Sequence, residues 1–261
     1  MYRHLVIAIV IAMGLVACTQ VTEPAPNVDG PTLSLIASSD TQGYTVDLLA
    51  EGLITVGYTP LYVRLKHSGS VVTNATVTII SDMDMGMHHH ACPVDQPVGT
   101  SPDQQGYYHT AALFTMPSTT AWTITIKFHD NDHDSSGEVT VVVPVGAAER
   151  VRTGMDASGM KYVIALQCPT EKVGLNDIKF GLYKTMDGFD FIPVNDATVS
   201  FNPSMPSMGH GSHGNVQPVS RSNGWYSGQV NYTMTGDWQI DATVDVPGGQ
   251  QFSVSYPVSV K

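Results

Sequence analysis

Apolar and polar residues alternate over short segments throughout residues 35–261, as at 76–79, 122–126 and 138–141. Such alternation is typical of β-strands that bury one face, because successive side chains point to opposite sides of a strand. The segments are rich in β-branched and aromatic residues, and turn-forming residues separate them at short intervals. Beyond the N-terminal region, no segment combines a sustained helical apolar period with capping residues. The pattern therefore predicts an all-β protein.

The chain contains one module twice. Residues 74–78 read Asn-Ala-Thr-Val-Thr, and residues 196–200 read Asp-Ala-Thr-Val-Ser. Repetition of this kind indicates repeated domains. Further pairs of segments match in the same order: 57–65 with 174–182, 83–90 with 205–213, 96–97 with 217–218, 106–108 with 224–226, 114–116 with 232–234, and 122–124 with 238–240.

The density of strand-like segments predicts the architecture of each module. About seven short strands per hundred residues is the pattern of an immunoglobulin-like sandwich. The Cys–Trp–Cys spacing of antibody domains is missing, so only the architecture is implied. We expect two tandem immunoglobulin-like β-sandwich domains over residues 35–146 and 155–261. The join falls between Pro144 and Tyr162, where Gly146 and Gly154 are typical of a linker.

The N-terminus has the features of an export signal. Arg3 and His4 precede an apolar run over residues 5–16, which is too short to cross a membrane comfortably. The run ends in Leu-Val-Ala-Cys, which resembles a bacterial lipobox. We expect a lipoprotein signal peptide at 1–17, lipidation of Cys18, and a polar, Pro-rich tether over 18–34. The alternative is an ordinary signal peptide with an incidental Cys. Lipidation would anchor the protein to a membrane of the cell envelope, on the periplasmic face or at the outer membrane.

Composition excludes two classes of protein. Only 13% of the residues are charged, which disfavours a bundle of long amphipathic helices. The formal net charge of −11 argues against nucleic acid as a partner, because phosphate binding needs clustered Lys and Arg.

No motif of a serine hydrolase, zinc protease or P-loop nucleotide-binding protein occurs, and we expect no enzymatic activity.

Methionine and histidine carry the candidate chemistry. The chain has 12 Met and 10 His, and many of them gather in the matched segments 83–90 and 205–213, each directly after a predicted strand. Thioethers select Cu(I), and imidazoles suit Cu(II) and other transition metals. We therefore expect copper as the cofactor. The expected ligands are Met83, Met85, Met87, His88, His89, His90 and Cys92 in module one, and Met205, Met208, His210 and His213 in module two; Met116 and Met234 are possible additional ligands.

Other interpretations of the same residues stay open. The Met side chains could fill the open end of each sandwich, with the His side chains solvated, or they could form a docking patch for a partner protein. Cys92 and Cys168 could form a disulfide in an oxidising compartment. The alternate carboxylates of residues 130–134 suggest a calcium loop but lack its later Gly and Glu, so an acidic hairpin tip is favoured. We interpret His67 as a surface turn residue.

The combined motifs resemble the YtkA-like domain, which is related to FixH-type proteins. The resemblance rests on the strand at 60–65, the Ala-Thr-Val segments, the Met/His segments, Gly-Tyr-Tyr and Gly-Trp-Tyr, and the Trp strands. It implies an extracytoplasmic β-sandwich associated with copper handling or oxidase assembly, and a copper-accepting or oxidase-assembly protein as partner. We therefore expect a lipid-anchored copper chaperone or buffer. The alternative is a non-enzymatic structural or adhesive protein of the cell surface.

Overall fold

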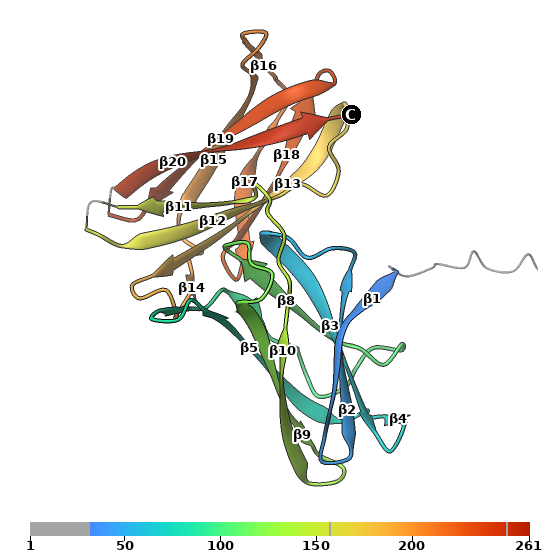
Figure 1. Ribbon diagram of the computed structural model, residues 1–261. Helices are drawn as coiled ribbons and strands as arrows, with labels where there is room; N and C mark the ends of the chain where they lie inside the picture. Colours follow the sequence, from blue (N-terminus) through green and yellow to red (C-terminus); the bar gives the residue numbers. More distant parts are fainter. Residues whose placement is uncertain (1–31, 157, 249) are drawn as a thin grey trace, which may run out of the picture. The chain divides into compact units, whose positions relative to one another are not determined.

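The computed structural model describes residues 32–156, 158–248 and 250–261 (Figure 1). The predicted signal peptide, Cys18 and residues 18–31 of the predicted tether lie outside the described residues. Residues 32–261 form one compact unit. The described residues form 20 strands in four antiparallel sheets, which make two β-sandwiches. They contain no helix long and apolar enough to cross a membrane.

Sandwich 1 comprises the strands β1 to β10. One sheet has the order β1-β2-β3-β8-β7, with β4 paired to β3, and the other has the order β10-β9-β5-β6. The bounds are β1 Leu33–Thr41, β2 Tyr44–Glu51, β3 Gly57–His67, β4 Ser70–Val71, β5 Ala75–Asp84, β6 His89–His90, β7 Val94–Asp95, β8 Tyr108–Phe114, β9 Trp122–Asp130 and β10 Ser135–Val142.

Sandwich 2 repeats this topology strand for strand. Its sheets have the orders β11-β12-β13-β18-β17, with β14 paired to β13, and β20-β19-β15-β16. The bounds are β11 Val151–Met155, β12 Lys161–Gln167, β13 Gly174–Thr185, β14 Ile192–Pro193, β15 Thr198–Met205, β16 His210–Gly211, β17 Val216–Ser222, β18 Trp225–Tyr232, β19 Gly236–Val246 and β20 Gln250–Val260. Both the all-β fold and the tandem sandwiches predicted from the sequence are confirmed.

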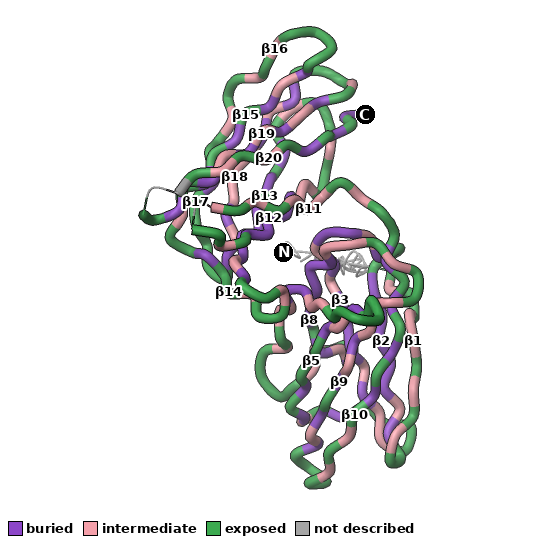
Figure 2. The backbone as a smooth tube through the Cα atoms, turned by 60° about the vertical axis from the view of Figure 1, so that its left-hand side comes forward, coloured by how far each residue is buried: buried purple, intermediate pink, exposed green. Residues whose placement is uncertain are grey.

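Each core lies between the two sheets of its sandwich, and the alternation in the sequence explains it. Along β5, buried positions alternate with exposed ones over most of the strand. The two tryptophans of the matched segments are the largest buried side chains, with Trp122 fully buried and Trp238 2% exposed. Figure 2 shows the buried positions running along the inner strands of both sandwiches. Because every second residue of a strand points to the same side, the alternating apolar residues of each sheet face the core between the two sheets.

Two segments begin earlier than their composition suggests. β1 starts at Leu33, inside the predicted tether, and β11 occupies Val151–Met155, inside the predicted join. Gly154 favours a linker in the sequence, but in the structure it pairs with Tyr162 in a regular ladder. A Cβ on Gly154 would lie 2.4 Å from the ring of Phe252. The glycine is therefore required by the packing of an aromatic ring against the strand, which a linear pattern does not reveal.

The two sandwiches share a small apolar cluster. It contains Leu113 of β8 together with Val163, Ala165 and Tyr183 of sandwich 2, all of them buried. The ring of Tyr58 meets the ring of Trp225 edge-on, with the ring centroids 4.9 Å apart. The two sandwiches are therefore joined by side-chain contacts as well as by the connecting chain.

The close approach of Phe252 to Gly154 predicts that adding a methyl group destabilises the protein at Gly154 but not at Gly146. We expect Gly154→Ala to lower the free energy of unfolding by about 1–3 kcal/mol, because the new Cβ would displace the Phe252 ring. Urea denaturation followed by circular dichroism measures this change. Gly146→Ala is the matched control, since its Cβ would meet no atom closer than 3.5 Å. Equal destabilisation by both substitutions would contradict the packing argument.

Candidate functional site

The Met/His segments form equivalent β-hairpins at the ends of β5 and β15. β6 pairs with β5 so that Met83 lies opposite His90, and β16 pairs with β15 so that Met205 lies opposite His210. Directly opposite residues of an antiparallel pair project from the same face of the sheet. Each hairpin, here called hairpin 1 (residues 83–90) and hairpin 2 (residues 205–211), therefore brings one thioether and one imidazole together.

The methionine of each pair is buried in the core that contains the tryptophan of its sandwich. Met83 is 5% exposed and lies opposite Trp122 in the sheet, while Met205 is 2% exposed and belongs to the core that contains Trp238. The terminal methyl of Met205 also fits against Gly236, where a Cβ would lie only 2.9 Å from it. These two sulfur atoms line the ends of the cores and are not presented on the surface.

A backbone hydrogen bond fixes the tryptophan in each sandwich. The indole N–H of Trp122 donates to the carbonyl of Met116 at 2.8 Å, and that of Trp238 donates to the carbonyl of Met234 at 3.0 Å. Met116 and Met234 are thus structural counterparts that hold the end of the core through their main chains. The Met116 side chain is half-buried, and that of Met234 is 37% exposed.

The turn of each hairpin presents further thioethers to solvent. Met87 is 90% exposed, Met208 is 61% exposed, and Met85 is exposed as well. An extended chain would have placed Met83, Met85 and Met87 on one face, but the strand ends at Asp84 and Gly86 adopts a positive φ of 84°. The turn therefore separates Met85 and Met87 from the buried Met83. In hairpin 2 the turn folds tightly, because the amides of Met208 and Gly209 both donate to the carbonyl of Met205 at 3.0 Å.

The histidines of the two segments have different surroundings. The imidazole of His210 is half-buried and meets the Trp238 ring edge-on, with the ring centroids 5.7 Å apart. His89 points to Asp82, with 3.1 Å between Nδ1 and each carboxylate oxygen, and this hydrogen bond raises the pKa of His89. His88 and His213 are exposed. His210 is therefore the imidazole best positioned beside a buried thioether and an aromatic ring.

Cys92 faces the interior of sandwich 1. It is 5% exposed within the core, and burial raises the pKa of its thiol to about 12. Its amide donates to the Ser81 hydroxyl and its carbonyl accepts from it, both at 3.0 Å. The thiol is therefore protonated at neutral pH. Cys92 and Cys168 are both free thiols in the structure.

The two hairpins lie at opposite ends of one long strand of sandwich 2. The amide of Ala91, next to hairpin 1, donates to the carbonyl of Gly188 at 3.0 Å, just beyond the last residue of β13. The first residue of β13, Gly174, pairs with Tyr232, whose ring packs on Trp238 beneath hairpin 2. A strand of this length spans roughly 35 Å. The hairpins therefore constitute two separate groups of donors.

Hairpin 1 borders a cavity whose wall includes a methionine that sequence reasoning missed. The cavity has a volume of about 520 Å³, and His90, Met116 and Met155 contribute to its lining. Met155 is exposed at the end of β11. Nothing in the linear order connects Met155 with hairpin 1, since it belongs to the other module and has no matched counterpart among the Met/His segments. The contact between the modules is the feature that brings it close.

Three solved structures of surface proteins match most of the chain at low sequence identity. Domains 5–6 of the S-layer protein SbsC share 15% identity, with 88% of this chain and 98% of that chain covered and a TM-score of 0.32. The Escherichia coli adhesin FdeC shares 11% identity over 89% and 85% of the two chains, with a TM-score of 0.29. The Yersinia pseudotuberculosis adhesin InvE shares 12% identity over 85% and 60%, with a TM-score of 0.26.

The family comparison is more specific. No curated protein matches the chain. The family model described as YtkA-like matches residues 156–243, a span that contains hairpin 2 and Trp238. The resemblance drawn from the sequence is thereby confirmed for sandwich 2, whose residues 156–243 match the YtkA-like domain.

Proposed function

We propose that this protein binds copper in the cell envelope, as a non-enzymatic chaperone or buffer held to a membrane through lipidated Cys18. Hairpin 2 is the principal Cu(I) site in this proposal, with Met205, Met208 and His210 as ligands. The observation that carries the proposal is the pairing of Met205 with His210, whose ring meets Trp238 edge-on. Sandwich 1 repeats it in the pairing of His90 with Met83, which lies opposite Trp122.

The donor set suits Cu(I) for chemical reasons. Thioether sulfur is a soft, neutral ligand that prefers Cu(I), and imidazole accepts both copper oxidation states. Neither group requires deprotonation of a thiol, so the raised pKa of Cys92 is no obstacle to binding. The indole ring beside His210 excludes water from one side of the site. The exposed sulfur of Met208 remains accessible from solvent, which favours exchange of copper with a copper-accepting or oxidase-assembly protein.

The first test weakens hairpin 2 without disturbing the core. We expect the double variant Met208→Leu/His210→Asn to bind Cu(I) at least about 10-fold more weakly at this site, because it removes two of three ligands. Competition against a chromophoric Cu(I) chelator measures the affinity. Met205 is left intact because it is 2% exposed, and its loss would also lower stability.

The matched control is Met186→Leu, which removes a thioether that is 72% exposed and lies outside both hairpins. We expect its Cu(I) affinity to equal that of the unmodified protein. An unchanged affinity in the double variant, or an equal loss in the control, would refute hairpin 2 as the site. Absence of any Cu(I) binding would favour the structural or adhesive alternative.

Separation of the hairpins predicts additive loss of copper. We expect about two Cu(I) equivalents in the unmodified protein, about one after Met208→Leu/His210→Asn, and about one after Met85→Leu/Met87→Leu/His90→Asn. The combined variant should bind none, because the two groups of donors lie at opposite ends of β13. Equilibrium dialysis with metal analysis gives these stoichiometries. Loss of both equivalents in either single-hairpin variant would show instead that the hairpins share one site.

A further inference from the structure

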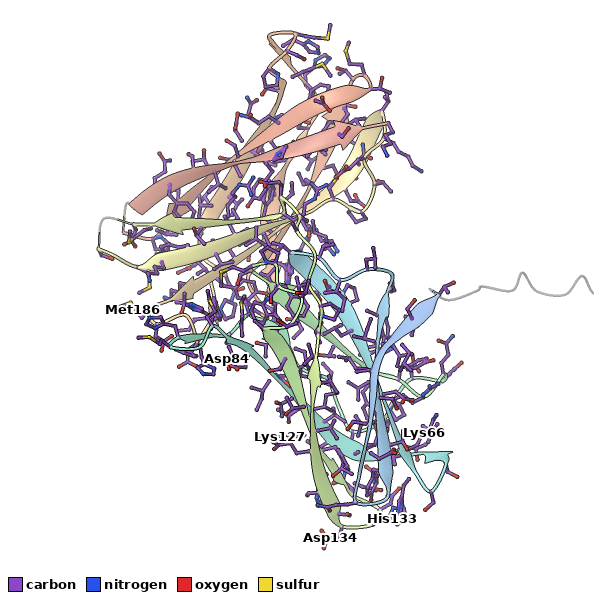
Figure 3. The ribbon with its side chains drawn as sticks, viewed as in Figure 1. Lys66, Asp84, Lys127, His133, Asp134 and Met186 are labelled. Carbon is purple, nitrogen blue, oxygen red and sulfur yellow. The ribbon has the colours of Figure 1, made fainter. Side chains whose placement is uncertain are left out.

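A second group of metal-binding side chains lies at the end of sandwich 1 opposite hairpin 1. Met83 pairs with Trp122 at one end of the β5–β9 ladder, and Ala75 pairs with Asp130 at the other. At this second end, His67 closes β3, Asp130 closes β9, and His133 lies in the β9–β10 turn. Each offers one ligand atom, and the three atoms lie within 4.8 Å of one another. Figure 3 shows His133 at this end of the sandwich.

Asp130 is a buried negative charge. Its side chain is fully buried, and its carboxylate accepts hydrogen bonds from the Tyr44 hydroxyl, the His133 imidazole and the Asp132 amide. Burial alone would raise the pKa of Asp130, but these hydrogen bonds outweigh it and hold the pKa below its usual value. Among the described residues, its only ion-pair partner is His133, and no Lys or Arg reaches it. A buried carboxylate of this kind is stabilised by a nearby cation.

Tyr44 orients two of the three candidate ligands at once. Its hydroxyl donates to Oδ2 of Asp130 at 3.0 Å, and its ring stacks on the ring of His67 with the centroids 4.4 Å apart. The ring of Phe128 also contacts that of Tyr44, with the ring centroids 4.9 Å apart. His133 completes the group, with its Nδ1 2.8 Å from Oδ2 of Asp130 and its ring edge-on to His67. A fixed carboxylate and a fixed imidazole are what a preorganised metal site requires.

We propose that His67, Asp130 and His133 bind a divalent transition-metal ion of the Zn²⁺ type. Two imidazoles and one carboxylate provide three protein ligands and leave a position for water, which is a common set for zinc. The ion would supply the positive charge that the buried carboxylate lacks. No described hydrogen bond involves the ring nitrogens of His67, so within the described residues its donor atom is available.

The other acidic residues of the turn do not converge on this site. Asp132 accepts a hydrogen bond from the side chain of Asn74 at 2.7 Å, and the carboxylate of Asp134 is 99% exposed beside His129. The arrangement therefore differs from a calcium loop, in which successive carboxylates surround one ion. It also changes the interpretation of His67, which contributes to the group and is not an isolated surface residue.

Sandwich 2 provides an internal comparison. Tyr44 pairs with His67 in sandwich 1, whereas the counterpart Tyr162 pairs with Lys184. The hydroxyl of Tyr162 donates to Asp156, which belongs to no group of two histidines and a carboxylate among the described residues. The fold of the module thus forms without this cluster, and the donors of sandwich 1 are not explained by a need of the fold.

The experiment compares Zn²⁺ binding among variants that all keep both Met/His hairpins. We expect His67→Asn/His133→Asn to bind one Zn²⁺ equivalent fewer than the unmodified protein in isothermal titration calorimetry. We also expect Zn²⁺ to raise the Tm of the unmodified protein more than that of the double variant. Because the hairpins are unchanged in both proteins, the difference is independent of whether the copper proposal holds.

The matched control is His109→Asn/His129→Asn, which removes two other histidines of sandwich 1 that lie near carboxylates. It should retain the full Zn²⁺ stoichiometry. Should the first double variant fail to fold, His133→Asn alone is informative, because this side chain is 56% exposed. We expect this single substitution to weaken Zn²⁺ binding by about 10-fold or more. Equal Zn²⁺ binding by the unmodified protein and the folded variant, or equal loss in the control, would overturn the proposal.

Discussion

The hydrogen bond between a buried indole and a methionine carbonyl organises the end of each sandwich that carries the Met/His hairpin. Trp122 donates to Met116 and Trp238 donates to Met234 in the same way. A fully buried indole N–H needs such a partner, so the chain before each Trp strand is held in place. Met83 lies opposite Trp122 in the sheet, and Met205 belongs to the same core as Trp238.

The same antiparallel ladder connects two chemically different ends of sandwich 1. At one end lie the thioethers and imidazoles of hairpin 1, and at the other lie two imidazoles with a buried carboxylate. Soft sulfur donors and borderline nitrogen and oxygen donors prefer different ions. The two ends of sandwich 1 thus carry donor sets of different kinds, one strand length apart. Among the described residues, sandwich 2 repeats only the Met/His hairpin, since Lys184 stands at the position that corresponds to His67.

The hairpins illustrate what alternating patterns can and cannot predict. The repeat correctly paired the segments 83–90 and 205–213, because equivalent segments of a duplicated module occupy equivalent places in the fold. The pattern could not show that Met83 and Met205 are buried while Met87 and Met208 are exposed. Burial depends on where the strand ends and the turn begins, and on the Trp side chain that comes from a distant strand. Cys92 is similar, since its burial depends on its place in the core of the sandwich.

The sequence by itself determined the all-β class, the tandem repeat and the residue types of the candidate metal ligands. These features depend on local alternation and on direct comparison of one segment with another, both of which are present in the linear chain. The tertiary structure decided that Gly154 lies beneath an aromatic ring, that Met155 approaches hairpin 1, and that His67 meets Asp130 and His133. Each of these is a contact between strands far apart in sequence. Only the strand register and the packing of the sheets fix such contacts, because neither follows from the spacing of residues along the chain.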